Sequence, residues 1–241
     1  MNRFARVSRI GLCLALTVAP LAAEPVCTSD AMIVFDGSGS MSEMGFNQLD
    51  LPRIFEARQA IRTVMPRVER VRRVGLIVYG PGPRDACSNI ALRFPPIPNA
   101  ATRVIGAVDT LEPAGDTPLT EAVAEAARTL RQTGEAGVVV LVTDGKETCG
   151  GAPCQLAATL AADAPGLVVH VIGFKVRGDY FSWESQGGGD YTSSVSVARC
   201  LAETTGGQYV PAETVEDLIG ALQRTLGCQL IGVLGQRPEN R

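Results

Sequence analysis

Oxygen-bearing side chains follow an apolar run early in the chain. Asp36, Ser38 and Ser40 stand in the sequence Asp-Gly-Ser-Gly-Ser, directly after apolar residues 31–35. The apolar run predicts a buried strand, whose end would deliver one carboxylate and two hydroxyls to the edge of a sheet. Such oxygen ligands suit Mg²⁺, Mn²⁺ or Ca²⁺ rather than zinc. A Gly/Ser turn in which Asp36 bonds its own backbone explains the same five residues, and the pentapeptide alone leaves both interpretations open.

Two further oxygen donors are expected at the same edge. Asp144 follows the apolar run at residues 138–143, and Thr117 lies in a Gly-Asp-Thr-Pro-Leu segment that leads into a helix. In open α/β sheets, ligands bind at the carboxyl ends of the strands, near the point where the strand order reverses. The sequence therefore predicts that Asp36, Thr117 and Asp144 meet on one rim.

Strand and helix patterns alternate along the chain. Strands are expected at residues 31–36, 74–80, 89–94, 138–143, 167–176 and 208–211, and helices at 53–70, 99–111, 118–132, 153–163, 195–205 and 214–226. Asn99 and Thr117 stand where N-caps are expected for two of these helices. The alternation predicts one α/β domain with a mostly parallel sheet that is covered by helices on both faces.

The N-terminal 23 residues have the pattern of a secretory signal peptide. Three arginines precede a short apolar stretch at residues 10–18, and small residues follow at 21–23. Cleavage there would move the formal net charge from −3 to −6, because three arginines leave with the signal. An acidic chain without a basic run argues against nucleic acid and anionic membranes as partners, and no later stretch is apolar enough to span a bilayer. A periplasmic or secreted protein is expected, with a domain at 27–228 and a flexible tail at 229–241.

Six cysteines remain after the signal is removed, and an even number in an exported chain indicates disulfides. Six cysteines allow 15 pairings in principle. Spacing favours a small local loop, a bridge between the two ends of the folded region, and a third pair by elimination. The expected pairs are Cys149–Cys154, Cys27–Cys228 and Cys87–Cys200. A zinc site is disfavoured, because the CxxC spacing is absent and His170 is the only histidine.

The Asp36–Ser40 segment, the Thr117 loop and Asp144 occur in an order that resembles the von Willebrand factor A (VWA) domain family, over roughly residues 30–226. Family members with all three segments build a metal-ion-dependent adhesion site (MIDAS). The resemblance implies that Ser38, Ser40 and Thr117 bind Mg²⁺ directly, with Mn²⁺ or Ca²⁺ as alternatives, and that Asp36 and Asp144 act largely through water, or directly in some states.

The same resemblance implies a Rossmann-like three-layer α/β sandwich. Its sheet would have six strands and be mostly parallel, with one antiparallel edge strand from a hairpin of the second and third strands. The Thr-Asp-Gly-Lys-Glu-Thr-Cys segment at residues 143–149 is similar to the bacterial exported branch of the family.

Three functions are compatible with such a site. The favoured one is a non-enzymatic binding module, in which a partner's Asp or Glu fills an exchangeable position on the cation. A metal-assisted hydrolase is disfavoured, because the only histidine is expected in the core and no Gly-x-Ser-x-Gly elbow surrounds Ser38 or Ser40. The third possibility is a cation that only stabilises the rim.

Other residues near these segments have two interpretations each. Asp116 and Glu147 are expected to be solvated loop acids, although either could tune the site. Aromatic residues in a glycine-rich loop near 177–193 either contact a partner or fold back onto the domain; they are Tyr180, Phe181, Trp183 and Tyr191.

Overall fold

A six-stranded sheet forms the centre of the computed structural model, which describes residues 29–44, 51–82, 86–134, 137–176 and 197–227. The strands are β1 (Ala31–Asp36), β2 (Val74–Tyr79), β3 (Ile90–Ile97), β4 (Val138–Thr143), β5 (Val168–Phe174) and β6 (Tyr209–Ala212). They lie in the order β3-β2-β1-β4-β5-β6, and only β2 and β3 pair antiparallel. The strand order therefore reverses between β1 and β4, where ligand sites of α/β sheets form.

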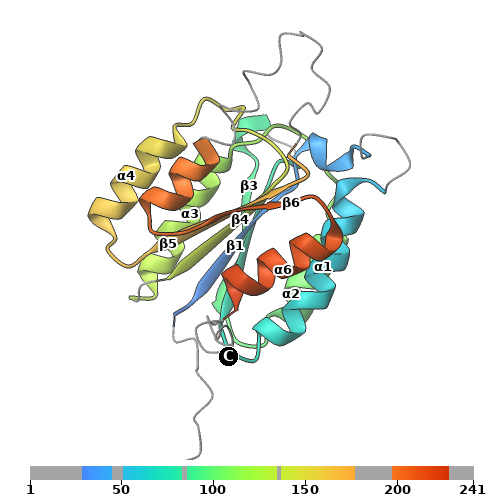
Figure 1. The fold of residues 1–241 in the computed structure, drawn as a ribbon, viewed down its shortest axis with the longest axis horizontal. Coiled ribbons are helices and arrows are strands. Elements are labelled where there is room, and N and C mark those ends of the chain that lie inside the picture. The colour runs from blue at the N-terminus through green and yellow to red at the C-terminus, as the bar shows by residue number, and fades with distance from the viewer. Residues whose placement is uncertain (1–28, 45–50, 83–85, 135–136, 177–196, 228–241) are drawn as a thin grey trace, which may run out of the picture.

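Helices cover both faces of this sheet (Figure 1). One face carries α1 (Arg53–Val68), α2 (Ala101–Asp109) and α6 (Val215–Leu226). The other carries α3 (Leu119–Gln132), α4 (Pro153–Asp163) and a helical segment at residues 197–204. Two short 3-10 helices, η1 (Gly39–Ser42) and η2 (Ala86–Ser88), lie in the connections. The predicted fold class, a three-layer α/β sandwich with one antiparallel edge strand, is confirmed.

Side-chain alternation in β1 divides the core into two halves. Ile33 and Phe35 belong to the apolar cluster under α1, α2 and α6, whereas Met32 and Val34 belong to the cluster under α3 and α4. All residues of β1 are buried. A parallel strand that is covered on both faces reads as a continuous apolar run, which is the pattern at residues 31–35.

The edge strand β3 is longer than the sequence predicts. It extends past Phe94 to Ile97 and includes Pro95 and Pro96. Proline cannot donate a hydrogen bond to a neighbouring strand, so it is tolerated in a strand only at an edge or a bulge. β3 meets both conditions, because it is the outermost strand beside β2 and its register with β2 shifts twice.

Two helix caps differ from the predictions. Asn99 has a φ of 53° and does not cap α2, whose Ala101 N–H donates instead to a Glu69 carboxylate oxygen at 2.8 Å. Likewise Thr117 does not cap α3, because Glu147 accepts the hydrogen bond of the Thr120 N–H. At the start of each of these helices, an acceptor from another element thus satisfies one free N–H group, which local sequence does not reveal.

Two disulfides join cysteines that are distant in sequence. Cys87 bonds Cys149, and Cys154 bonds Cys200. The predicted pairs Cys149–Cys154 and Cys87–Cys200 are therefore wrong. The chain after β4 is bonded to the β2–β3 connection before it enters α4, and the start of α4 is bonded to the 197–204 segment. The predicted Cys27–Cys228 bridge lies outside the described residues.

None of the helices in the described ranges is long and apolar enough to cross a bilayer.

Replacing Leu130 of α3 with alanine should destabilise the domain. Its side chain is fully buried in the cluster under α3 and α4. Leu→Ala changes at such sites lose about 2–5 kcal/mol of the free energy of unfolding. Equilibrium unfolding in urea measures this loss. Leu92→Ala on β3 is the matched control, because Leu92 is 43% exposed and should lose less than about 1 kcal/mol. Equal losses in the two variants would contradict the proposed core.

Candidate functional site

Three loops pack together at the carboxyl ends of β1, β2 and β4. The Gly39 N–H donates to the Gly115 carbonyl at 3.0 Å, and the Ala114 N–H donates to the Gly37 carbonyl at 2.9 Å. Gly115 has a φ of 77°, and a Cβ on this residue would collide with the Gly80 carbonyl oxygen. Only glycine suits a left-handed backbone in such close contact. This contact holds the loop before α3 against the loop after β1.

Asp36 lies fully buried at the end of β1. Its Oδ1 accepts from the Ser38 N–H at 2.8 Å, and its Oδ2 accepts from the Thr143 hydroxyl at 2.6 Å. The bond to Ser38 is the local turn interaction that the simpler interpretation of the pentapeptide predicts. The bond to Thr143 is long-range and connects β1 to the end of β4. Asp36 therefore orders the loop and also faces the region where the predicted ligands gather.

The two serines connect Asp36 to Asp144. The Ser38 and Ser40 hydroxyl oxygens are 3.1 Å apart, and the Ser40 hydroxyl donates to Asp144 Oδ1 at 2.7 Å. A hydroxyl that donates a hydrogen bond to a carboxylate keeps its oxygen lone pairs available for a cation. Ser38 is 2% exposed and Asp144 6%, so these groups lie in a largely dehydrated environment.

Thr117 reaches the same place from the α3 side. Its backbone forms two hydrogen bonds with Thr148, from the Thr117 N–H to the Thr148 hydroxyl and from the Thr148 N–H to the Thr117 carbonyl. The position that a Cβ would take on Gly145 is 3.8 Å from the Ser40 hydroxyl oxygen and 4.0 Å from that of Thr117. The two hydroxyls therefore border the same small space beside Gly145.

Glu147 has a structural role that the sequence analysis missed. One of its carboxylate oxygens accepts from both the N–H and the hydroxyl of Thr120, and the other accepts from the Cys149 N–H. The residue is half-buried, so the expectation of a solvated loop acid is wrong. Asp116 is exposed, as expected. Because Glu147 satisfies the start of α3, the Thr117 hydroxyl is not used as a helix cap.

Arg53 is the second residue that the sequence analysis missed. It begins α1, and only 4% of it is exposed. Its Nη1 donates to Asp144 Oδ2 and to the Ser40 carbonyl, both at 2.9 Å, and lies 3.3 Å from Glu43 Oε2. The signal was available: Arg53 stands four residues before the buried Ala57, on the apolar face of the predicted helix.

Burial raises the pKa of Asp144 to about 7, and repulsion from Asp36 acts in the same direction. The hydrogen bond from Ser40 and the positive charge of Arg53 partly oppose this rise. A second positive charge at the cluster would favour the ionised form of Asp144. The donor set consists of two carboxylates and three hydroxyls, which are hard oxygen ligands suited to Mg²⁺, Mn²⁺ or Ca²⁺.

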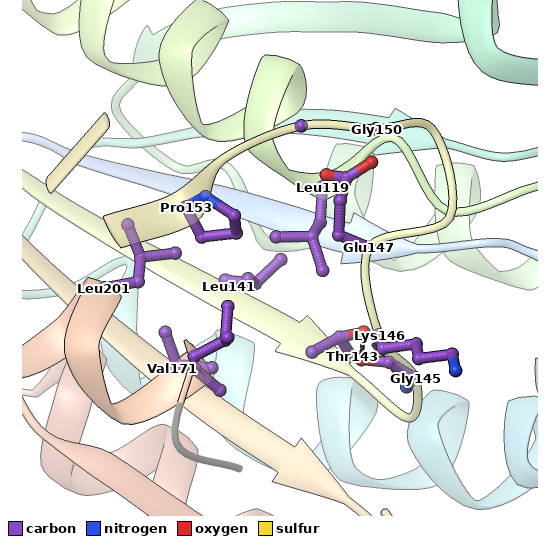
Figure 2. A pocket seen from close by; sticks show the side chains of 13 residues that line it. Leu119, Leu141, Thr143, Gly145, Lys146, Glu147, Gly150, Pro153, Val171 and Leu201 are labelled. Carbon is purple, nitrogen blue, oxygen red and sulfur yellow. Dashed lines mark hydrogen bonds between the residues drawn. The ribbon is translucent and has the colours of Figure 1, made fainter. Parts of the chain in front are cut away.

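An apolar cavity of about 250 Å³ lies on the α3–α4 side of the loop that carries Asp144. Figure 2 shows aliphatic side chains of Leu119, Leu141 and Leu201 around it, with Thr143 and Gly145 at one border. None of the five predicted ligands lines this cavity. The predicted ligands therefore lie outside the cavity, whose lining is mainly apolar, although Thr143 and Gly145 border both the cavity and the oxygen cluster.

His170 lies away from the oxygen cluster. It pairs with Val140 in the middle of the β4–β5 ladder, whereas Thr143 stands at the end of β4. It is half-buried rather than in the core, and its Nδ1 accepts from the Gln208 N–H at 3.1 Å. Burial lowers the pKa of His170. Its position in mid-sheet gives no support to a Ser–His pair at Ser38 or Ser40.

Comparison with known proteins identifies a sequence relative in a bacterium. The chain is 28% identical over 213 residues to YwmD of Bacillus subtilis (strain 168), an uncharacterized protein. The alignment covers 82% of this chain and 93% of that protein. The relative supports a shared fold over most of the chain and carries no functional description.

Solved structures share the fold at low sequence identity. Proximal thread matrix protein 1 from the mussel byssus, solved with a zinc-occupied MIDAS motif, superimposes with a TM-score of 0.56 at 17% identity over 83% of this chain. The pilus adhesin SpaC of Lactobacillus rhamnosus GG gives a TM-score of 0.61 at 15% identity over 85% of this chain. The chain spans only 46% of the mussel protein and 30% of the adhesin.

A family model agrees with these likenesses. The von Willebrand factor type A domain model matches residues 30–192, which include β1 through β5 and all five predicted ligands. Because that match spans well over half of the chain, the protein belongs to the von Willebrand factor type A domain family.

Proposed function

We propose that the protein is an exported binding module that captures an acidic residue of a protein or peptide partner through a divalent cation, with Mg²⁺ the favoured ion. The observation that carries this proposal is the convergence of oxygen atoms from three separate segments. Ser38, Ser40 and Thr117 would ligate the cation directly, and Asp36 and Asp144 largely through water. Mg²⁺ demands octahedral oxygen coordination and retains exchangeable positions, which a partner carboxylate fits.

The chemistry of the cluster supports binding rather than hydrolysis. A hydrolase needs a general base or an activated nucleophile close to the reacting atom. Both carboxylates of the cluster already accept two hydrogen bonds each, and His170 lies in mid-sheet. A purely structural cation is the remaining alternative. The hydrogen bonds among Asp36, Ser38 and Thr143 order the rim without one, which favours a cation that serves a partner.

Export is part of the proposal. The predicted signal peptide at residues 1–23 and the tail at 229–241 lie outside the described residues, as do both proposed boundaries of the domain, at 27 and 228. Two long-range disulfides are typical of an oxidising compartment, such as the periplasm or the extracellular space. The aromatic loop near residues 177–193 also lies outside the described residues, and its contact with a partner stays a prediction.

Selection from a random peptide library tests the partner chemistry. The purified protein, immobilised, is exposed to displayed peptides in Mg²⁺ and, separately, in EDTA. Peptides enriched only in Mg²⁺ should contain Asp or Glu, and changing that residue to Asn or Gln should abolish their binding. Enrichment that is equal in EDTA, or that is indifferent to the acidic residue, would contradict the proposed mode of capture.

Removing the Thr117 hydroxyl should weaken cation binding without unfolding the protein. Thr117→Val keeps the shape of the side chain and both backbone bonds to Thr148. We expect the Kd for Mg²⁺, measured by calorimetry, to rise at least about tenfold, because mutation even of residues that only orient a metal ligand typically costs about 10- to 100-fold in affinity. The melting temperature in EDTA should stay close to that of the wild type.

Thr129→Val is the control for this variant, because Thr129 is equally buried but lies within α3, where its hydroxyl bonds the Glu125 carbonyl. Its Mg²⁺ affinity should be unchanged. A Thr117→Val protein that binds Mg²⁺ as tightly as the wild type would exclude Thr117 as a ligand. A variant that melts early even in EDTA would instead favour a structural role for this residue.

Gly115→Ala should disrupt the loop packing on which the site depends. The residue has a φ of 77°, and the added Cβ would press on the Gly80 carbonyl oxygen. Gly134→Ala is the matched control, because Gly134 has a φ of 79° and open space around its Cβ position. Both variants should lose about 1 kcal/mol or more of the free energy of unfolding from the strained φ. Only Gly115→Ala should also lose Mg²⁺ affinity, and equal affinities would show that the 37–39 and 114–115 loops do not need this contact.

A further inference from the structure

Arg53 is unusual among the buried side chains of this protein. Four charged residues are buried among those that the structure describes, and three of them, Asp36, Asp144 and Arg53, lie in the oxygen cluster. Arg53 contacts the cluster through a single nitrogen, Nη1, which is 2.9 Å from Asp144 Oδ2. Its Nε is buried and has no hydrogen-bond partner within the described part of the chain. Burial of a guanidinium that is only partly bonded costs stability, so packing alone does not account for Arg53.

Arg53 changes the net charge of the oxygen cluster. Asp36 and Asp144 contribute two negative charges when both are ionised, and Arg53 offsets one of them. Glu43 also contacts Arg53, but its side chain is 64% exposed and solvent screens it. Without Arg53, the two ionised carboxylates would cancel the charge of a divalent cation bound beside them. With Arg53 present, the same loaded cluster keeps one net positive charge.

The hydrogen bonds direct this effect toward Asp144. One oxygen of that carboxylate accepts from the Ser40 hydroxyl and the other from Arg53 Nη1, so both oxygens are engaged within the protein. An engaged carboxylate donates less negative charge to a nearby cation than a free one. Arg53 therefore opposes strong neutralisation of the cation by Asp144.

We infer that Arg53 is a positioning and charge-setting residue of the cation site: it weakens cation binding and, in return, leaves the loaded site positive for the carboxylate of a partner. This inference rests on the proposed function and deepens it. It holds that Arg53 strengthens the binding of the partner's carboxylate although it ligates neither the cation nor the partner. It predicts opposite changes in two affinities when the charge of Arg53 is removed. A merely structural role would weaken both.

Calorimetry on neutral variants tests the inference. Arg53→Met keeps an unbranched side chain similar to the aliphatic part of arginine but removes the charged guanidinium, and Arg53→Gln is a second neutral variant that retains a hydrogen-bond donor. We expect the Kd for Mg²⁺ to fall about tenfold in both, as removal of one unit charge near a divalent ion in a partly buried site implies. Acetate binding to the Mg²⁺-saturated protein should weaken roughly three- to tenfold, with acetamide as the uncharged reference. Arg53→Lys should lie close to the wild type.

Arg62→Met is the matched control. Arg62 lies on the same helix and pairs with Asp109, and its side chain is 55% exposed. This change removes the same charge from α1 away from the cluster, so both affinities should be unchanged. Circular dichroism in EDTA verifies that each variant is folded.

The outcomes tell a failure of this inference apart from a failure of the proposed function. Wild-type binding of Mg²⁺ with unchanged or weaker binding in both neutral variants overturns the role of Arg53 and leaves the proposed function standing. Binding by the neutral variants but not by the wild type supports the role of Arg53 and overturns the proposed function for the native chain. No binding by any of these proteins overturns both.

Discussion

Burial of two carboxylates at the end of a parallel sheet is the constraint on which the rest of the rim depends. A buried carboxylate needs hydrogen bonds or a charged partner for each of its oxygens. Asp36 obtains them from the Ser38 N–H and the Thr143 hydroxyl, and Asp144 from Ser40 and Arg53. Each of these bonds crosses from one segment to another, apart from the one to Ser38. The loops therefore have to close around the two carboxylates for the domain to fold.

At this rim, the residues that hold the loops differ from the predicted ligands. Glu147 holds the start of α3, and Thr148 holds the backbone of Thr117. These contacts leave the Thr117 hydroxyl free of the capping role that its position before a helix suggests. In a similar way, glycines at 37, 80 and 115 let three backbones approach closely, so that short side chains are sufficient to meet. In a site of this kind, the surrounding loops set the positions of the predicted ligands, and only a few short side chains would have to contact a cation.

Most of the fold could be predicted from the sequence, because apolar runs such as residues 31–35 and 138–143 have the composition of strands buried on both faces. The candidate ligands could be predicted because Asp36, Ser38, Ser40 and Asp144 follow such runs and Thr117 stands just before a helix. The contacts that fix them could not. The contacts of Arg53 and Glu147 and the two disulfides join residues that are more than ten positions apart in the sequence. Local spacing carries no information about which loops come together in the fold. The prediction that Thr117 caps α3 is wrong for the same reason, because Glu147, which is distant in the sequence, accepts the hydrogen bond of the Thr120 N–H instead.

The pattern of bridges has a consequence for how the chain must mature. Cys149 and Cys154 are five residues apart but are not bonded to each other. The Cys87–Cys149 bond closes a loop of 62 residues, and the Cys154–Cys200 bond closes a loop of 46 residues. In an unfolded chain, loop-closure entropy favours the short pairing over either long one. Oxidation ahead of folding would therefore trap Cys149 with Cys154, and only thiol–disulfide exchange could release them. Correct maturation requires the sheet to assemble before its cysteines are oxidised, or an isomerase in the compartment where the oxidation takes place.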